Sequence, residues 1–150
     1  PAFESLEISL NLPTFVIREK HMEGRKRNTL LTGRKGEELA IHFLKQKGFT
    51  ILDTNWRAGH KELDIVARRE ERIHFVEVRS RSATAVVAPE ATIDRSKQRK
   101  VMAAARAYMA KYRITEEVRF DVIAIVFGPG GIYVPDYDLE YIPDAFTLFL

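Results

Sequence analysis

The chain has 150 residues, a length that suits one domain with a hydrophobic core and is short for two. Hydrophobic residues make up 45% of it and charged residues 30%, which excludes a wholly disordered chain, and no apolar run approaches the ~20 residues needed to span a bilayer. The absence of cysteine excludes disulfides, thiol nucleophiles and cysteine-ligated metals, while a net charge of +3 is only a weak indication of a nucleic-acid partner.

The first thirty residues differ from the rest. Apolar and polar residues alternate from Leu6 to Leu12, the period of a half-buried strand, which Pro13 ends. His21-Met22 resembles a cloning junction, so Met22 is an alternative native start, and we treat residues 1–32 as an N-terminal extension without an assigned function. Acidic residues interrupt any signal-peptide pattern near the start, so a cytoplasmic location without membrane contact is expected.

The remainder, residues 33–150, shows regular helix and strand patterns. Helical spacing predicts helices at Arg34–Lys47 and Asp94–Tyr112. Apolar and β-branched residues predict strands at Phe49–Trp56, Glu62–Arg68, Ile73–Arg79, Phe120–Phe127 and Ile132–Val134. The first three strands are close in sequence, so we expect an antiparallel meander, and the nearly all-apolar fourth is expected to be covered on both faces. The glycines after it predict a hairpin turn, and the C-terminal tail is expected to pack back onto this single α/β sandwich.

Two strand acids are the first candidates for chemistry. Residues two apart on a strand share a face, so Asp64 points with Glu62, and Glu77 with Arg79, while Leu63, Ile65, Val76 and Val78 fill the opposite face. Carboxylates from two neighbouring strands form a negative site that resists joint ionisation, and a hard divalent cation would relieve this. The alternative is that Glu77 pairs with Arg79 or Arg68 on a solvent-exposed face.

A third acid lies on the first predicted helix. Glu37 lies on the core-facing stripe with Ala40, Ile41 and Leu44, whereas Glu38 falls on the polar side. Two interpretations remain open: a first-turn carboxylate favoured by the helix dipole, or an acid that joins Asp64 and Glu77.

These segments together resemble a known family. The residues that carry the resemblance are Gly33–Ala40, Asn55-Trp56-Arg57, Glu62–Ala67, Phe75–Arg81, Lys97 and Arg119–Val122. In order and spacing, from about Gly33 to Phe146, they look like the YraN family of endonuclease-like proteins, which is similar to Holliday-junction resolvases and carries the PD-(D/E)XK motif. The resemblance implies a restriction-endonuclease-like fold with an αβββαβ core, a mixed sheet flanked by helices.

The resemblance also implies roles for individual residues. Asp64 and Glu77 would be metal ligands, Glu37 a helical acid near the metal, and Arg79 the basic residue of the motif. The implied activity is hydrolysis of DNA phosphodiester bonds with Mg²⁺ or Mn²⁺, selective for structure or nonspecific. Resolvase-like relatives often act as dimers, so monomer and homodimer both remain open.

The motif normally has a lysine where this chain has Arg79. Arginine does not lose its proton, so it cannot act as a general base, although it can stabilise negative charge on a phosphate. Two alternatives follow: a nucleic-acid-binding module that keeps the nuclease fold without cleavage, and an interaction protein that reuses the fold.

Basic residues recur along the second predicted helix. Arg95, Arg99, Arg106 and Arg113 follow one side, with Lys97 and Lys100 nearby, and Lys97 is placed to approach the sheet edge. We interpret Arg95, Lys97, Arg99 and Arg106 as a nucleic-acid-binding surface that contacts phosphates without reading sequence; the alternative is a solvated helix face.

Four other residues are assigned structural roles. His60 and His74 lack the spacing of a metal motif, so surface or core positions are expected. Asp121 is expected to form a structural ion pair with Arg119, which lies on the same face, and Trp56 to pack at the core edge.

Overall fold

A computed structural model describes residues 7–11, 14–18, 29–83, 93–129 and 136–147, and the side chains of those from residue 31 onwards. The predicted strand at Ile132–Val134 and the chain beyond residue 147 lie outside these residues. Neither helix within them is long and apolar enough to cross a membrane.

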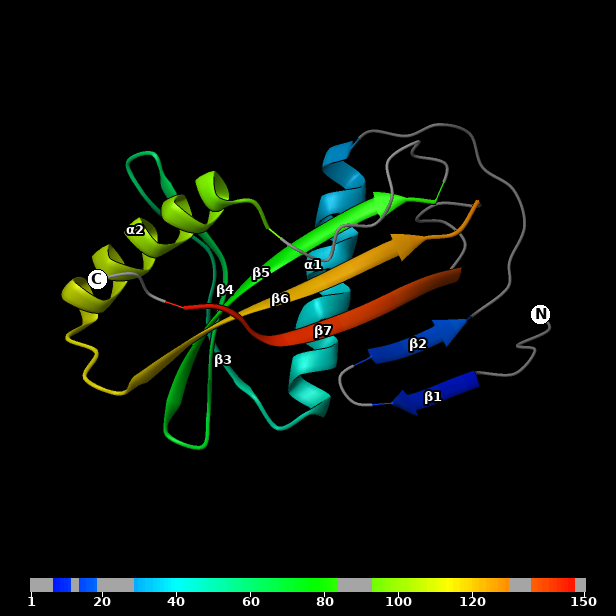
Figure 1. The fold of residues 1–150 in the computed structure, drawn as a ribbon, viewed down its shortest axis with the longest axis horizontal. Coiled ribbons are helices and arrows are strands. Elements are labelled where there is room, and N and C mark those ends of the chain that lie inside the picture. The colour runs from blue at the N-terminus through cyan, green and yellow to red at the C-terminus, as the bar shows by residue number, and fades with distance from the viewer. Residues whose placement is uncertain (1–6, 12–13, 19–28, 84–92, 130–135, 148–150) are drawn as a thin grey trace.

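The described residues form an α/β fold with one mixed sheet. Its elements follow in the order β1 (Glu7–Asn11), β2 (Thr14–Arg18), α1 (Thr29–Gln46), β3 (Thr50–Ala58), β4 (Lys61–Arg69), β5 (Arg72–Ser82), α2 (Arg95–Tyr112), β6 (Glu117–Phe127) and β7 (Asp136–Phe146). The sheet has seven strands in the order β1-β2-β7-β6-β5-β4-β3 (Figure 1). Only the β5–β6 pair is parallel among these neighbours, because α2 carries the chain back across the sheet between them.

The predicted helix–three strands–helix–strand order and the β3–β4–β5 meander are confirmed. The prediction for the C-terminal segment was incomplete: residues 136–146 form the strand β7, antiparallel to β6. Its acidic residues and Pro143 weakened the strand pattern, although Tyr137, Leu139 and Tyr141 alternate as buried residues. The strand pattern at Leu6–Leu12 is confirmed by β1, which pairs with β2, and β2 pairs with β7.

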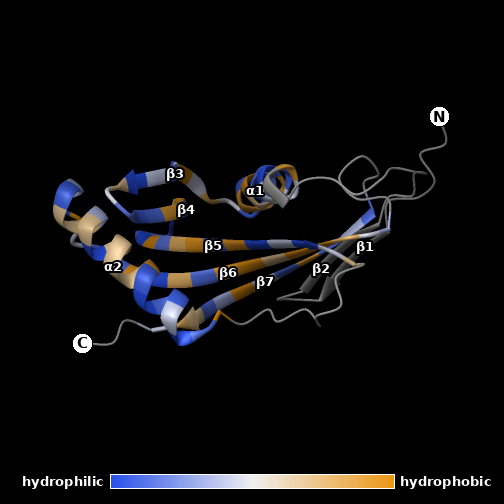
Figure 2. Ribbon diagram, turned by 90° about the horizontal axis from the view of Figure 1, so that it is seen from above, coloured by the Kyte–Doolittle hydropathy of each residue, from blue (hydrophilic) through white to orange (hydrophobic). Residues whose placement is uncertain are grey.

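The two helices cover opposite faces of the sheet at different ends. Helix α1 packs chiefly against β5, and α2 chiefly against β4. Seen from above, α1 lies on one side of the strands and α2 on the other, and hydrophobic residues follow β6 between them (Figure 2). One core cluster joins Ala40 and Leu44 of α1 to Val76 and Ile123; the other joins Val101 and Ala105 of α2 to the opposite side of the sheet.

Along β4, the side chains do not alternate regularly between the two faces of the sheet. Ile65 packs in the α1 cluster with Val76, whereas Leu63 packs in the α2 cluster. The prediction that Leu63 and Ile65 share a face was therefore wrong. The register explains this, because paired rungs between β4 and β5 end at Ile65 and Val76, and β4 turns away from β5 beyond them.

Helix α1 packs tightly against β5 at Gly36. A methyl group at this position would lie 1.7 Å from Ser80 Oγ and 2.8 Å from Ser80 Cβ, which is too close for any side chain. The hydroxyl of Ser80 is buried and has no hydrogen-bond partner among the described residues. The missing side chain of Gly36 therefore sets the distance between helix and sheet, and with it the position of the next residue, Glu37.

A buried polar network ties β5, β6 and β7 together on the α1 side. Asp121 is 0% exposed, and its Oδ2 lies 2.6 Å from His74 Nδ1 and accepts a hydrogen bond from the Tyr141 hydroxyl at 2.6 Å. Its other oxygen accepts from the Asp144 backbone N–H at 2.9 Å. The predicted ion pair between Asp121 and Arg119 was wrong, because Arg119 pairs with Glu117 and Asp144. The core position expected for His74 is confirmed.

Replacing Gly36 by alanine should push α1 away from β5 and lower the free energy of unfolding by about 1–3 kcal/mol, the usual cost of overpacking. Urea unfolding followed by circular dichroism measures this. Gly33→Ala on the same helix is the matched control, because nothing lies within 4 Å of its added methyl, so it should stabilise by up to about 1 kcal/mol. Equal effects of the two substitutions would contradict the close approach.

Asp121→Ala should lower the free energy of unfolding by roughly 3 kcal/mol or more, because it leaves His74, the Tyr141 hydroxyl and a backbone N–H without their buried partner. Thermal and urea unfolding measure the change. Glu117→Ala, which removes an exposed acid from surface ion pairs, should cost less than about 1 kcal/mol. A loss at Asp121 as small as this control would show that the network contributes little.

Candidate active site

The two strand acids meet where β4 leaves β5. Ile65 and Val76 are the last paired residues on this side, so Asp64 and Glu77 occupy the next position, beyond the backbone ladder. The Val78 N–H donates to Asp64 Oδ2 at 2.9 Å. A side-chain carboxyl thus takes a backbone hydrogen bond at the point where the two strands separate, which holds Asp64 against β5.

Asp64 and Glu77 lie together, with Asp64 half-buried and Glu77 buried. The alternative that Glu77 pairs with Arg79 or Arg68 on a solvent-exposed face was wrong about the exposure, since Glu77 is 5% exposed, and about Arg68, which pairs with Glu116. Burial, followed by the charge of Glu77 and a hydrogen bond to it, raises the pKa of Asp64, and the Val78 N–H and the charge of Lys97 lower it; the net result is a pKa of about 7. The pair therefore holds a proton in the range where an exposed aspartate would have lost it.

Lys97 reaches this pair from the first turn of α2. The Asp94 carboxyl caps the helix by accepting the Lys97 N–H at 2.8 Å, and Lys97 Nζ lies 2.8 Å from Glu77 Oε1. Burial alone lowers the pKa of Lys97, but the hydrogen bond and charge of Glu77 and the charge of Asp64 outweigh it, so the pKa is raised. Lys97 was predicted to approach the sheet edge; it does reach the sheet, but its contact is Glu77 on the inner strand β5.

Glu37 stands on the other side of the same opening. Its carboxylate accepts a hydrogen bond from Asn55 Nδ2 at 2.9 Å, and Asn55 adopts a left-handed backbone with φ of 50°. Burial raises the pKa of Glu37, the Asn55 hydrogen bond lowers it, and the charge of Asp64 raises it, which leaves it raised. Glu37 therefore senses Asp64 electrostatically but is bound to β3, and Asn55 is a site residue that the sequence reasoning did not assign.

The donor chemistry of the acid pair fits a hard divalent cation. Two neighbouring carboxyl groups that retain a proton resist joint ionisation. A hard divalent cation would relieve their repulsion and would take their oxygens as ligands. In the described part of the chain, however, no three His, Asp or Glu side chains are gathered closely enough to hold a metal ion. The structure thus brings Asp64 and Glu77 together and keeps Glu37 apart, with Asn55.

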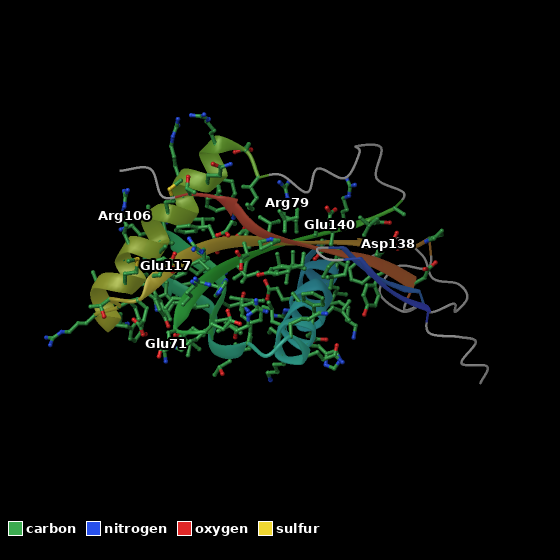
Figure 3. The ribbon with its side chains drawn as sticks, turned by 60° about the horizontal axis from the view of Figure 1, so that its bottom comes forward. Glu71, Arg79, Arg106, Glu117, Asp138 and Glu140 are labelled. Atoms are coloured by element: carbon green, nitrogen blue, oxygen red, sulfur yellow. The ribbon has the colours of Figure 1, made fainter. Side chains whose placement is uncertain are left out.

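Arg79 lies two residues after Glu77 on β5 and is exposed. Figure 3 shows it on the face of the sheet opposite α1, the same side as Glu140. The strand register places Arg79, Ala124 and Glu140 in one row across β5, β6 and β7. The basic residue of the motif is therefore exposed on the sheet face opposite α1, and Lys97 Nζ lies 2.8 Å from Glu77 of the acid pair.

The arginines of α2 form a separate surface. Arg95, Arg99 and Arg106 are exposed, and with Met102 they line a hollow of about 310 Å³. Residues two apart on a helix point in nearly opposite directions, so Arg95 and Arg99 face away from Lys97. Figure 3 shows Arg106 on the outer side of α2. The surface predicted from the four basic residues is thus divided, with Lys97 inside the site and three arginines outside.

Among the remaining candidates, His60 is exposed in the β3–β4 turn and Trp56 is buried, as expected for surface and core-edge roles. The ring of Trp56 packs edge-on against Tyr108. The hydroxyl of Tyr108 donates to Asp53 Oδ2 at 2.7 Å, which fixes α2 to β3 beside the site.

Asp64→Asn should stabilise the protein more at pH 8 than at pH 5. The pKa of Asp64 is raised on folding, so the folded chain keeps a proton that the unfolded chain loses above about pH 4, and wild-type stability falls as the pH rises towards about 7. Asparagine removes this cost, which is a few kcal/mol at most because one pKa unit corresponds to about 1.4 kcal/mol. Urea unfolding at both pH values measures it. Glu38→Gln, an exposed change, should show no such pH dependence, and a difference independent of pH at Asp64 would contradict the raised pKa.

The family described as uncharacterised protein family UPF0102 matches residues 36–125, the span that contains Glu37, the acid pair and Lys97. This is the same family as YraN under another designation.

Curated relatives align over most of their own length. UPF0102 proteins of Bacteroides thetaiotaomicron and Porphyromonas gingivalis are 40% and 39% identical over 114 and 118 residues, which cover 76% and 79% of this chain and 90% and 85% of the relatives. A UPF0102 protein of Anaeromyxobacter dehalogenans is 44% identical over 115 residues, 76% of this chain and 82% of the relative. The chain belongs to the UPF0102 family.

Proposed function

We propose that this protein is a metal-dependent endonuclease that hydrolyses DNA phosphodiester bonds. The observation that carries the proposal is the pairing of half-buried Asp64 with buried Glu77, with Lys97 Nζ 2.8 Å from Glu77 Oε1. Acids in a protein interior are costly, and a cluster of perturbed acids with one lysine at a strand opening is typical of a functional site.

The arrangement of elements supports a restriction-endonuclease-like fold. The helix α1, the β3–β4–β5 meander, the crossover α2 and the parallel strand β6 follow the order that the motif resemblance implies. Asp64 and Glu77 come from the second and third strands of the meander, which are the positions of the two acids in that motif. A fold by itself hosts many functions, so the argument for hydrolysis depends on the site.

Asp64 and Glu77 would hold Mg²⁺ or Mn²⁺, because carboxylate oxygens are the ligands these ions prefer. Such a cation would supply charge neutralisation at the phosphate and a more acidic water. The protein's own groups then have distinct tasks. The Val78 N–H orients Asp64, and Asn55 orients Glu37 at the edge of the site. The guanidinium groups of Arg95, Arg99 and Arg106 attract the DNA backbone.

A second candidate is a DNA-binding module without cleavage. The observation that favours it is Arg79, which is exposed on β5 and carries a guanidinium that cannot act as a general base. The arginines on the outer side of α2 would serve this function equally well. The two candidates differ in one measurable property, which is strand scission.

The test is incubation of the full chain with a four-way DNA junction and with a single-stranded oligonucleotide, in Mg²⁺, in Mn²⁺ and in EDTA. We expect cleavage that requires the divalent ion and falls at least about a hundredfold in Asp64→Asn and Glu77→Gln, because the ligands are lost. Glu38→Gln, an exposed substitution on α1, is the control and should cleave like wild type.

Three other results are informative. Salt-dependent binding without cleavage by the wild type would select the binding module. Cleavage undiminished in Asp64→Asn would place any activity elsewhere. Failure of the wild type to bind either DNA at low salt would exclude both candidates and point to an interaction protein that reuses the fold.

A further inference from the structure

Lys97 lies at the boundary between the acid pair and the solvent. Its Nζ is 2.8 Å from Glu77 Oε1, and its side chain is 38% exposed whereas that of Glu77 is 7% exposed. The ammonium group therefore has one side against a buried carboxylate and another towards the opening. A lysine ammonium has three N–H donors, and the contact with Glu77 Oε1 uses one of them.

The position of Lys97 is set by several independent contacts. The Asp94 cap fixes the first turn of α2, and Gln98 Nε2 donates to the Ile93 carbonyl at 2.8 Å in the same turn. One turn further along, Val101 is buried against the sheet. The ammonium is thus held at the acids by a rigid helix, and the helix N-terminus adds a partial positive charge on the same side.

We infer that Lys97, which lies on α2, contacts the DNA phosphate bound at Asp64 and Glu77. Lys97 thereby has the role that the motif assigns to the basic residue on the strand, which is Arg79 in this chain. The inference depends on the proposed function in one respect, that a phosphodiester binds at this pair. Arg79 is exposed on the sheet face opposite α1 in a row with Glu140, and Lys97 Nζ lies 2.8 Å from Glu77 Oε1 of the pair. A phosphate that approaches the acids meets the ammonium of Lys97 at the opening.

The test is a binding cycle that does not require cleavage. Binding of the four-way junction and of the single strand is measured in EDTA by fluorescence anisotropy, and the DNA that wild type binds more tightly is used. A methylphosphonate, which removes one phosphate charge, is then placed at successive positions along a strand. Lys97→Met should weaken binding of unmodified DNA about fivefold at low salt, as expected for one lysine–phosphate contact.

The diagnostic result is the methylphosphonate position at which the difference in DNA binding between wild type and Lys97→Met disappears. If Lys97 contacts the phosphate at the acids, the effect of Lys97→Met vanishes with the methylphosphonate at one position only. Asp64→Asn, which should strengthen binding by removing negative charge, must lose its effect at that same position. Lys45→Met, an exposed lysine-to-methionine change on α1, is the control and should couple to no position.

The outcomes separate this inference from the proposed function. A Lys97 effect that is equal at every methylphosphonate position, or that couples to a different phosphate from Asp64, would overturn the inference. Binding to neither DNA would overturn both proposals. Coupling of Lys97 and Asp64 to one phosphate in a protein that never cleaves would support the inference and reject the nuclease.

Discussion

The separation of β4 from β5 beyond Ile65 and Val76 is the constraint on which the site depends. Where the ladder ends, a backbone N–H of β5 would face solvent or the interior without a strand partner, and the Asp64 carboxyl accepts it at 2.9 Å. This hydrogen bond holds Asp64 beside the buried Glu77. The cost of placing the two carboxyl groups together in a partly buried position appears as the raised pKa of Asp64.

The rest of the molecule holds this opening from both sides. On one face, Gly36 lets α1 pack closely on β5 and presents Glu37 to Asn55. On the other face, α2 carries Lys97 to Glu77 and is fixed to β3 through Tyr108 and Asp53. The buried Asp121 network stabilises the central strands without contributing to the site, because it lies in the α1 core. The scaffold is thus rigid around a gap that is polar and charged.

The three kinds of charge on the protein have different consequences. The acid pair is desolvated, so its electrostatic energy is large and depends on pH. Lys97 is only partly desolvated and can serve both an acid and an incoming anion. The exposed arginines on the outer side of α2 contribute through screened attraction, which determines association with a polyanion more than the chemistry at the gap.

The sequence by itself determined the order of elements, because apolar periodicity and turn residues are local signals, and it identified Glu37, Asp64, Glu77 and Lys97 from type and spacing. Residues 136–146 were not recognised as the strand β7, because acidic residues and Pro143 weakened the strand pattern. Their pairing with β6 in the tertiary structure is what makes this segment a strand. The partners of each acid were decided by tertiary structure. Alternation along β4 breaks at Asp64, and the predicted nucleic-acid-binding surface combined Lys97 with three arginines that face away from it. The assignment of Glu77 to Lys97, Glu37 to Asn55 and Asp121 to His74 depends on contacts between segments far apart in the chain. Such contacts depend on how strands separate and helices cross, which no local pattern encodes.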